Sequence, residues 1–248
     1  MSIESCLNRR DIWRGNRSTI TTRSVVPTGF DELDQCLPGG GWPLGAMTEV
    51  LVKDINHSPL WLIAPALSVL SKQARWQTWI TPPHTPFAPA LNDNGIELSR
   101  ILLVRPSRQQ DALWAAEESL RSGDCSVVLF WTQHLGRTPL RRLQLAAERS
   151  QTWMIYFCTG RTVDSHTSAA LRIQCQPDPD GIQLNILKCR GGRSVNNLTL
   201  LRRTPVQHIP FDMSYCPWIS VQTPVLYREA QPRELSLPFH ISPPKLPH

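Results

Sequence analysis

The sequence predicts an α/β domain in which a mostly parallel sheet is flanked by helices. Between residues 25 and 204, apolar runs typical of buried strands alternate with amphipathic stretches that have helical periodicity. The chain has 248 residues, of which 41% are hydrophobic, so it can form a large core and is not disordered as a whole. The strand–helix alternation favours parallel strands joined by right-handed crossovers.

The individual elements follow from local patterns. Ser58 and Pro59 are suited to the N-cap and first turn of a helix that extends to about residue 72. The apolar run 100–104 is typical of a strand buried on both faces, and Gly123 is placed to end a helix over 109–121. Thr138 and Pro139 open a third helix. The expected strands are 48–51, 77–80, 100–104, 126–131, 153–157 and an antiparallel pair, 171–174 with 182–187.

Composition divides the chain into three zones. Residues 1–24 form a basic N-terminal arm with 5 basic and 2 acidic residues, and residues 25–204 form the α/β domain. Residues 205–248 contain nine prolines and balanced charge, which is typical of an extended, flexible C-terminal tail. The net charge of +6 indicates a mild bias toward acidic partners.

Cysteine spacing and hydropathy limit the classes of protein. The seven cysteines include no C-x-x-C pair, which favours reduced thiols and no metal site. The longest uncharged apolar stretch, about residues 60–70, is too short to span a bilayer, and the N-terminus is polar. We therefore expect a cytoplasmic protein that does not insert into membranes.

A glycine-rich entry to the first core strand carries a family resemblance. Residues 27–34 read P-T-G-F-D-E-L-D, and residues 39–49 read G-G-G-W-P-L-G-A-M-T-E. This order resembles the start of a RecA-type ATPase core, and the resemblance implies a RecA-like core of P-loop-NTPase type. The following window, 52–59, contains no glycine to let a backbone approach phosphate, and it places Asp54 and Pro59 there. We therefore expect a degenerate nucleotide site.

The other groups that phosphoryl transfer needs are also replaced. Thr81 follows the second strand where a RecA-type enzyme has an acid, and Trp131 stands where the magnesium-binding aspartate is expected. We predict no enzymatic activity, no catalytic residue and no cofactor. The alternative is a divergent ATPase, for which Lys53, otherwise a solvated lysine, would contact the nucleotide.

Six further segments narrow the resemblance. In order they are 79–83, 86–91, 113–117, 120–123, 141–148 and 187–193. Together they resemble the ImuA family of RecA/SulA-like proteins associated with translesion DNA synthesis. The resemblance implies a non-catalytic accessory or scaffold of error-prone synthesis and mutagenesis in the SOS response to DNA damage. The implied partners are an ImuB-like protein, an error-prone C-family polymerase and RecA.

Basic and aromatic residues supply the candidate contacts. Lys188, Arg190 and Arg193 surround two glycines and form either a DNA- or partner-binding loop or a solvated turn. We expect any contact with DNA to be indirect or weak. A solvated helix face is predicted to carry Arg141, Arg142 and Arg149, and packing in the core or at its rim is predicted for Trp114 and Trp131.

The tail contains a short peptide that resembles a sliding-clamp-binding motif. Its key residues are Glu234, Leu235, Leu237 and Phe239, with glutamate in place of the usual glutamine. Such peptides place apolar side chains in a preformed groove, so the sliding clamp is a further predicted partner.

A second function is compatible with the same RecA-like fold. The alternative is a SulA-like SOS inhibitor of cell division that binds the tubulin-like septation GTPase. Filamentation of cells that overproduce the protein would distinguish this alternative from a translesion accessory.

Overall fold

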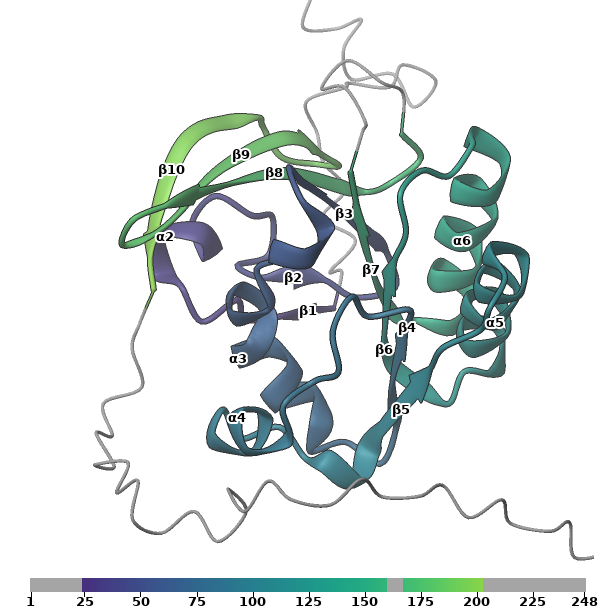
Figure 1. Cartoon of the computed structure of the whole chain (residues 1–248). Helices are drawn as coiled ribbons and strands as arrows, with labels where there is room; N and C mark the ends of the chain where they lie inside the picture. Colours follow the sequence, from purple (N-terminus) through teal and green to yellow (C-terminus); the bar gives the residue numbers. More distant parts are fainter. Residues whose placement is uncertain (1–23, 160–166, 203–248) are drawn as a thin grey trace, which may run out of the picture. The chain divides into compact units, whose positions relative to one another are not determined.

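The computed structural model describes residues 24–159 and 167–202 (Figure 1). The predicted basic arm and proline-rich tail lie almost entirely outside these ranges, so their boundaries stay predictions.

A mixed sheet forms the centre of the described chain, in the order β10-β9-β8-β3-β7-β6-β4-β5. Its strands are β3 (Met47–Val52), β4 (Trp76–Ile80), β5 (Ile101–Val104), β6 (Cys125–Trp131), β7 (Trp153–Cys158), β8 (Leu171–Asp178), β9 (Gly181–Cys189) and β10 (Val195–Leu201). The pairs from β8 through β3, β7, β6 and β4 to β5 are parallel, whereas β8–β9 and β9–β10 are antiparallel. A separate antiparallel pair joins β1 (Val25–Val26) to β2 (Trp42–Pro43).

Helices cover the two faces of the sheet (Figure 1). On one face lie α3 (Leu60–Ser71) and α4 (Ala88–Asp93), and on the other lie α5 (Gln109–Ser122) and α6 (Arg137–Ser150). The short elements are α2 (Asp31–Asp34) and the 3₁₀ turns η1 (Ile55–His57) and η2 (Leu98–Arg100). The amphipathic patterns of α5 and α6 direct their apolar stripes toward the sheet.

Two apolar clusters, one on each face, hold the layers together. The α3 cluster contains several buried aromatic rings, including Trp42 stacked on Trp153 and Trp131 stacked on Phe157, with ring centroids 5.5 and 5.0 Å apart. The α5–α6 cluster is mostly aliphatic. β6 and β7 contribute side chains to both clusters. Their apolar runs are continuous because both faces of these strands are buried.

The predicted RecA-like core of P-loop-NTPase type is wrong. The sheet is mixed, and the chain leaves β3 through the single 3₁₀ turn η1 before α3 begins. A glycine-rich entry, an apolar strand and a helix recur in many α/β folds, because each element has a local packing reason. These features did not distinguish one such fold from another.

Two local predictions are also wrong. The run 100–104 is not buried on both faces, because β5 is an edge strand in which Leu102 and Leu103 are 48% and 42% exposed. Ser58 does not cap α3, since its hydroxyl donates to the carbonyl oxygen of Ile55 in η1 and Pro59 holds the N-cap position. The predicted third helix is confirmed as α6, which begins at Arg137 after Gly136, one residue before Thr138.

None of the helices in the described ranges combines the length and hydropathy that crossing a bilayer requires. Within the same ranges, no group of three or more His, Cys, Asp or Glu residues is arranged to hold a metal ion.

Candidate functional site: the β5 edge

The outer edge of β5 is an unprotected strand in the described part of the chain. There β5 pairs with β4 alone, and its four residues are all apolar. Edge strands usually carry charges or prolines that block pairing with other chains. The nearest charges are Arg100 before the strand and Arg105 after it. The edge is therefore open to main-chain pairing with an extended segment.

Both faces of β5 present an exposed leucine. Ile101 packs against the α3 cluster and Val104 against the α5–α6 cluster. Because side chains alternate along a strand, Leu103 lies on the α3 side and Leu102 on the α5 side. A strand added at this edge would cover one leucine on each face.

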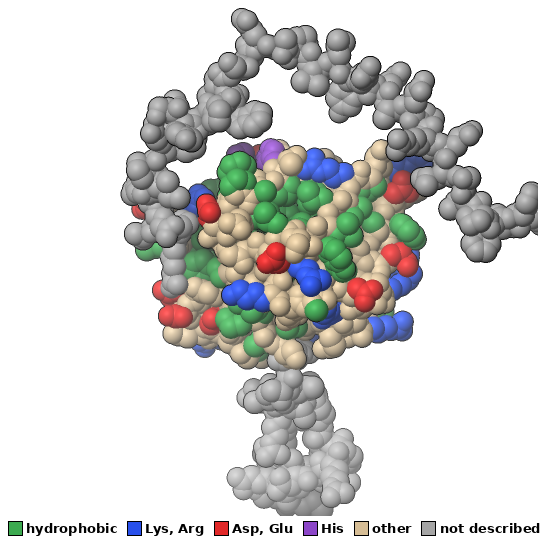
Figure 2. All heavy atoms as spheres, turned by 90° about the horizontal axis from the view of Figure 1, so that it is seen from below, with side chains coloured by type: hydrophobic (Ala, Val, Ile, Leu, Met, Phe, Trp, Pro, Cys, Tyr) green, Lys and Arg blue, Asp and Glu red, His purple; other side chains and the backbone are tan. Residues whose placement is uncertain are grey.

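Other exposed apolar side chains occur in the same part of the chain. Large hydrophobic residues exposed by 39% or more include Val69 on α3, Trp76 on β4, Phe87 before α4, Leu98 in η2 and Trp114 on α5. In the view from below, hydrophobic side chains gather in patches between scattered acidic and basic groups (Figure 2). Trp114, predicted to pack in the core or at its rim, is 65% exposed.

The carboxyl ends of β3, β4 and β6 border two hollows of about 410 and 520 Å³. η1 contributes to both. Its N-cap, Asp54, accepts hydrogen bonds from the backbone N–H of Asn56 at 3.0 Å and contacts Nδ1 of His57 at 2.8 Å. These bonds, the backbone N–H first, lower the pKa of Asp54. Lys53 is exposed on the rim of the larger hollow.

Thr81 lies in the smaller hollow with a left-handed backbone, at φ 51°. Its N–H donates to the carbonyl oxygen of Val104 at 2.9 Å, and its hydroxyl donates to the carbonyl oxygen of Trp131. Trp131 itself is buried, as predicted for rim or core packing. Thr81 thus joins the ends of three neighbouring strands, and its bonds hold a backbone conformation that is costly for a β-branched residue.

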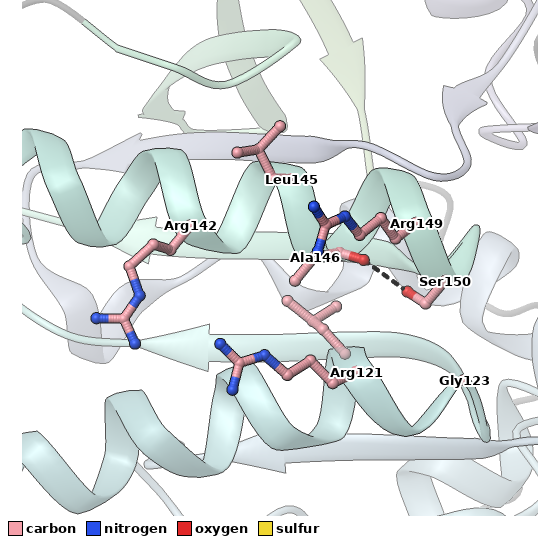
Figure 3. A pocket seen from close by; sticks show the side chains of 8 residues that line it. Arg121, Gly123, Arg142, Leu145, Ala146, Arg149 and Ser150 are labelled. Atoms are coloured by element: carbon pink, nitrogen blue, oxygen red, sulfur yellow. Dashed lines mark hydrogen bonds between the residues drawn. The ribbon is translucent and has the colours of Figure 1, made fainter.

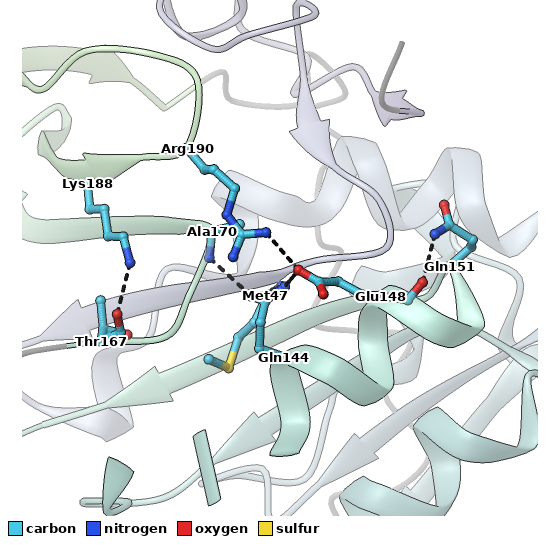
Figure 4. Close-up of polar contacts among 8 residues, drawn as sticks. All are labelled: Met47, Gln144, Glu148, Gln151, Thr167, Ala170, Lys188 and Arg190. Carbon is cyan, nitrogen blue, oxygen red and sulfur yellow. Dashed lines mark hydrogen bonds and ion pairs between the residues drawn. The ribbon is translucent and has the colours of Figure 1, made fainter. Parts of the chain in front are cut away.

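The predicted Lys188, Arg190 and Arg193 loop begins at the end of β9 and forms part of a polar network (Figure 4). Lys188 donates to the carbonyl oxygen of Thr167 at 2.8 Å, and desolvation by burial, followed by the charge of Arg190, lowers its pKa. Arg190 forms an ion pair with Glu148 on α6 at 2.7 Å. Arg193 is exposed in the turn. The first two basic groups are engaged within the chain, which leaves Arg193 as the outward-facing member.

The predicted clamp motif, Glu234, Leu235, Leu237 and Phe239, lies outside the described residues.

Sequence reasoning missed the β5 edge because an apolar run shows that a strand forms and does not show how many neighbours it has. One signal was available, since arginines flank the four apolar residues on both sides. Flanking charges of this kind are typical of strand ends near solvent.

Comparison with known proteins gives the family resemblance. The family model described as "Cell division inhibitor SulA" matches residues 45–154. Residues 45–154 are SulA-like. We refer to them as the SulA-matched segment, which extends from just before β3 into β7 and contains β5 and every exposed apolar residue named above. This match is to SulA and not to the ImuA family that the sequence motifs resemble.

Relatives agree with the family model. The chain is 36% identical over 91 residues to a cell division inhibitor SulA of Edwardsiella piscicida, covering 37% of this chain and 54% of that protein. It is 30% identical over 104 residues to the SulA of Yersinia enterocolitica, covering 42% and 62%. The chain therefore spans less than two thirds of these curated relatives. A crystal structure of SulA from Pseudomonas aeruginosa shares 31% identity, with 46% of this chain and 98% of that one covered and a TM-score of 0.40.

Proposed function

We propose that the protein inhibits cell division in the SOS response by binding a protein of the septation machinery, the tubulin-like GTPase. The observation that carries this proposal is the SulA-matched segment, because its relatives are named cell division inhibitors. The proposal favours the predicted alternative, a SulA-like division inhibitor, over the non-catalytic accessory role in translesion synthesis.

The β5 edge is the contact surface that we assign to this role. An extended segment of the partner adds a strand beside β5 through main-chain hydrogen bonds, and its alternate side chains cover Leu102 and Leu103. Arg100 and Arg105 at the two ends favour a segment with acidic flanks. This mode needs no rearrangement of the sheet.

Overproduction in growing bacteria tests the function, with cell length and binding of the purified septation GTPase as the two measurements. We expect filamentation by the wild type and loss of both effects in Leu102→Lys/Leu103→Lys. The matched control is Leu201→Lys, a leucine 63% exposed on the opposite edge strand, β10, outside the SulA-matched segment. Normal division on overproduction, with no binding, would refute the proposal. Equal loss in the control would refute the assignment to β5.

A second candidate is the ImuA-like accessory role in translesion synthesis, with an ImuB-like protein, an error-prone C-family polymerase and RecA as partners. One observation favours it: β8, β9 and β10 extend the sheet beyond the SulA-matched segment. In this proposal Arg193, beside Lys188 and Arg190, contacts the partner or DNA, and the tail motif from Glu234 to Phe239 binds the sliding clamp. Co-purification from DNA-damaged cells tests it, with Arg193→Glu and Leu235→Ala/Phe239→Ala as variants. Recovery of none of these partners would contradict it.

A further inference from the structure

A groove of about 620 Å³ lies between α5 and α6, and no part of the function proposed above uses it (Figure 3). Its floor is apolar: Leu120 and Ala146 are buried, and Leu145 is 42% exposed. Both helices have 14 residues, so the groove can accompany a partner helix for several turns. An exposed leucine in a concave surface is a site where another apolar side chain can be buried.

Three arginines line the groove. Arg121 extends from α5 toward α6, while Arg142 and Arg149 extend from α6 into the same space (Figure 3). Arg141, one residue before Arg142, is exposed and does not line the groove. The guanidinium groups thus lie around an apolar floor, which is the arrangement that an amphipathic, acidic segment requires.

A buried carboxylate positions two of the arginines. Glu117 is 2% exposed, and its Oε2 contacts Arg142 directly and lies 3.6 Å from Nη2 of Arg121. Arg121 also pairs with Glu118 at 2.9 Å. Among the described residues Arg149 forms no ion pair, so its charge is available to a ligand. The rim of the groove therefore keeps a positive charge at Arg149, although Glu117 and Glu118 partly neutralise Arg121 and Arg142.

The positive charge of the groove favours an acidic protein segment over three other occupants: the chain's own terminal segments, a second copy of the chain and nucleic acid. The chain's own terminal segments are not acidic, since residues 1–24 carry 5 basic and 2 acidic groups and residues 205–248 carry 3 of each. A second copy docked through the same groove would bring like-charged arginines together. Nucleic acid binds through phosphates and gains little from an apolar floor above a buried carboxylate.

We propose that the α5–α6 groove binds an acidic amphipathic helix of a partner protein. Apolar side chains of the helix pack on Leu145 and Ala146, and its carboxylates pair with Arg149 and Arg142. Since the β5 edge is not part of this groove, the inference does not depend on the proposed function.

A designed peptide tests the inference on the full-length protein. The probe is a fluorescein-labelled helical peptide of about 14 residues with leucine on one face and glutamate on both flanks. A control peptide has lysine in place of each glutamate. Fluorescence anisotropy measures binding. We expect the glutamate peptide to bind at least about tenfold more tightly than the lysine peptide. Arg149→Glu and Leu145→Ser should each weaken it by about tenfold, whereas the matched variant Arg141→Glu, which makes the same charge change outside the groove, should not.

Several outcomes would overturn the inference. If Arg141→Glu and Arg149→Glu weakened binding of the glutamate peptide equally, binding would depend on the net charge of the protein and not on the groove. Tighter binding of a single-stranded oligonucleotide, lost in Arg149→Glu, would assign the groove to nucleic acid. A dimer in sedimentation that Arg149→Glu dissociates would assign it to a second copy. Unfolding midpoints of the three variants verify that each is folded, since all three positions are exposed.

Discussion

Glu49 and Arg172 form an ion pair inside the sheet. They lie opposite each other on the paired parallel strands β3 and β8, with Oε2 and Nε 3.3 Å apart and exposures of 0% and 3%. Cys158 of β7 donates from its Sγ to Oε1 of Glu49 at 3.7 Å. The pair therefore connects the β8–β10 extension to the SulA-matched segment by a buried charge contact.

Replacing one member of this pair should cost more stability than the pair contributes, because the remaining charge stays buried without its partner. We expect Glu49→Gln or Arg172→Met each to lower the free energy of unfolding by about 3–5 kcal/mol, because a single substitution leaves the other charge buried. The double variant Glu49→Gln/Arg172→Met should lose less stability than the sum of the two single losses. Urea unfolding of all four proteins measures the coupling. Additive losses would show that the two side chains do not stabilise each other.

A buried glutamine provides a second test of the same region. Oε1 of Gln144 on α6 accepts hydrogen bonds from the backbone N–H groups of Met47 and Ala170 at 3.1 and 3.2 Å (Figure 4). Gln144→Leu leaves both donors without this acceptor, so we expect a loss of about 2–4 kcal/mol in urea unfolding. The matched control is Gln110→Leu on the exposed side of α5, which should change stability by less than about 0.5 kcal/mol. Similar values for the two variants would contradict the role of Gln144.

Local sequence patterns predicted most core elements and few of the long-range relations. The α5 boundaries and the Gly123 ending were confirmed, since amphipathic periodicity and a left-handed glycine act within one turn. β8 and β9 were confirmed as an antiparallel pair, because the turn between them has a local signature. By contrast β10 was missed, since two asparagines interrupt its pattern, and its pairing with β9 depends on tertiary context.

The candidate site depended even more on tertiary context. Leu102 and Leu103 are exposed whereas Leu129 of β6 is buried, and among the described residues β5 has a neighbouring strand on one side while β6 has one on each side. Arg149 and Arg141 both lie on α6, and only the position of α5 makes Arg149 part of a groove. Distances between elements decide both features, and these distances are not encoded in short motifs.

Thr81 should respond differently to two substitutions because its backbone and hydroxyl have opposing effects. Thr81→Val removes the hydrogen bond to Trp131 and keeps a β-branched side chain at φ 51°, so we expect a loss of about 1–2 kcal/mol. Thr81→Gly also removes the bond but relieves the strained backbone, and its stability should lie closer to that of the wild type. Thermal or urea unfolding measures both. A glycine variant less stable than the valine variant would show that strain is not important there.

Thiol reactivity should follow burial. Burial raises the pKa of Cys175 from 9.0 to about 12. At pH 9 the folded protein therefore keeps this thiol protonated, and iodoacetamide should modify it only after unfolding in urea. Because the unfolded thiol loses its proton first as the pH rises from 9 toward 12, the folded state should lose stability over that interval. Peptide mass spectrometry locates the label, and rapid labelling of Cys175 in the native protein would contradict its burial.

The β10 extension can be weakened at one glycine. A Cβ on Gly181 would lie 2.0 Å from the carbonyl oxygen of Leu200, so Gly181→Ala should push β10 away from β9. We expect faster hydrogen exchange at the amides of β10 while β3, β6 and β7 remain protected. The matched control Gly123→Ala meets no atom within 4 Å and carries only the cost of a left-handed backbone, about 1 kcal/mol, with β10 still protected. Since β10 lies outside the SulA-matched segment, division inhibition by Gly181→Ala should persist. Loss of inhibition with β5 still protected would show that the extension takes part in partner binding.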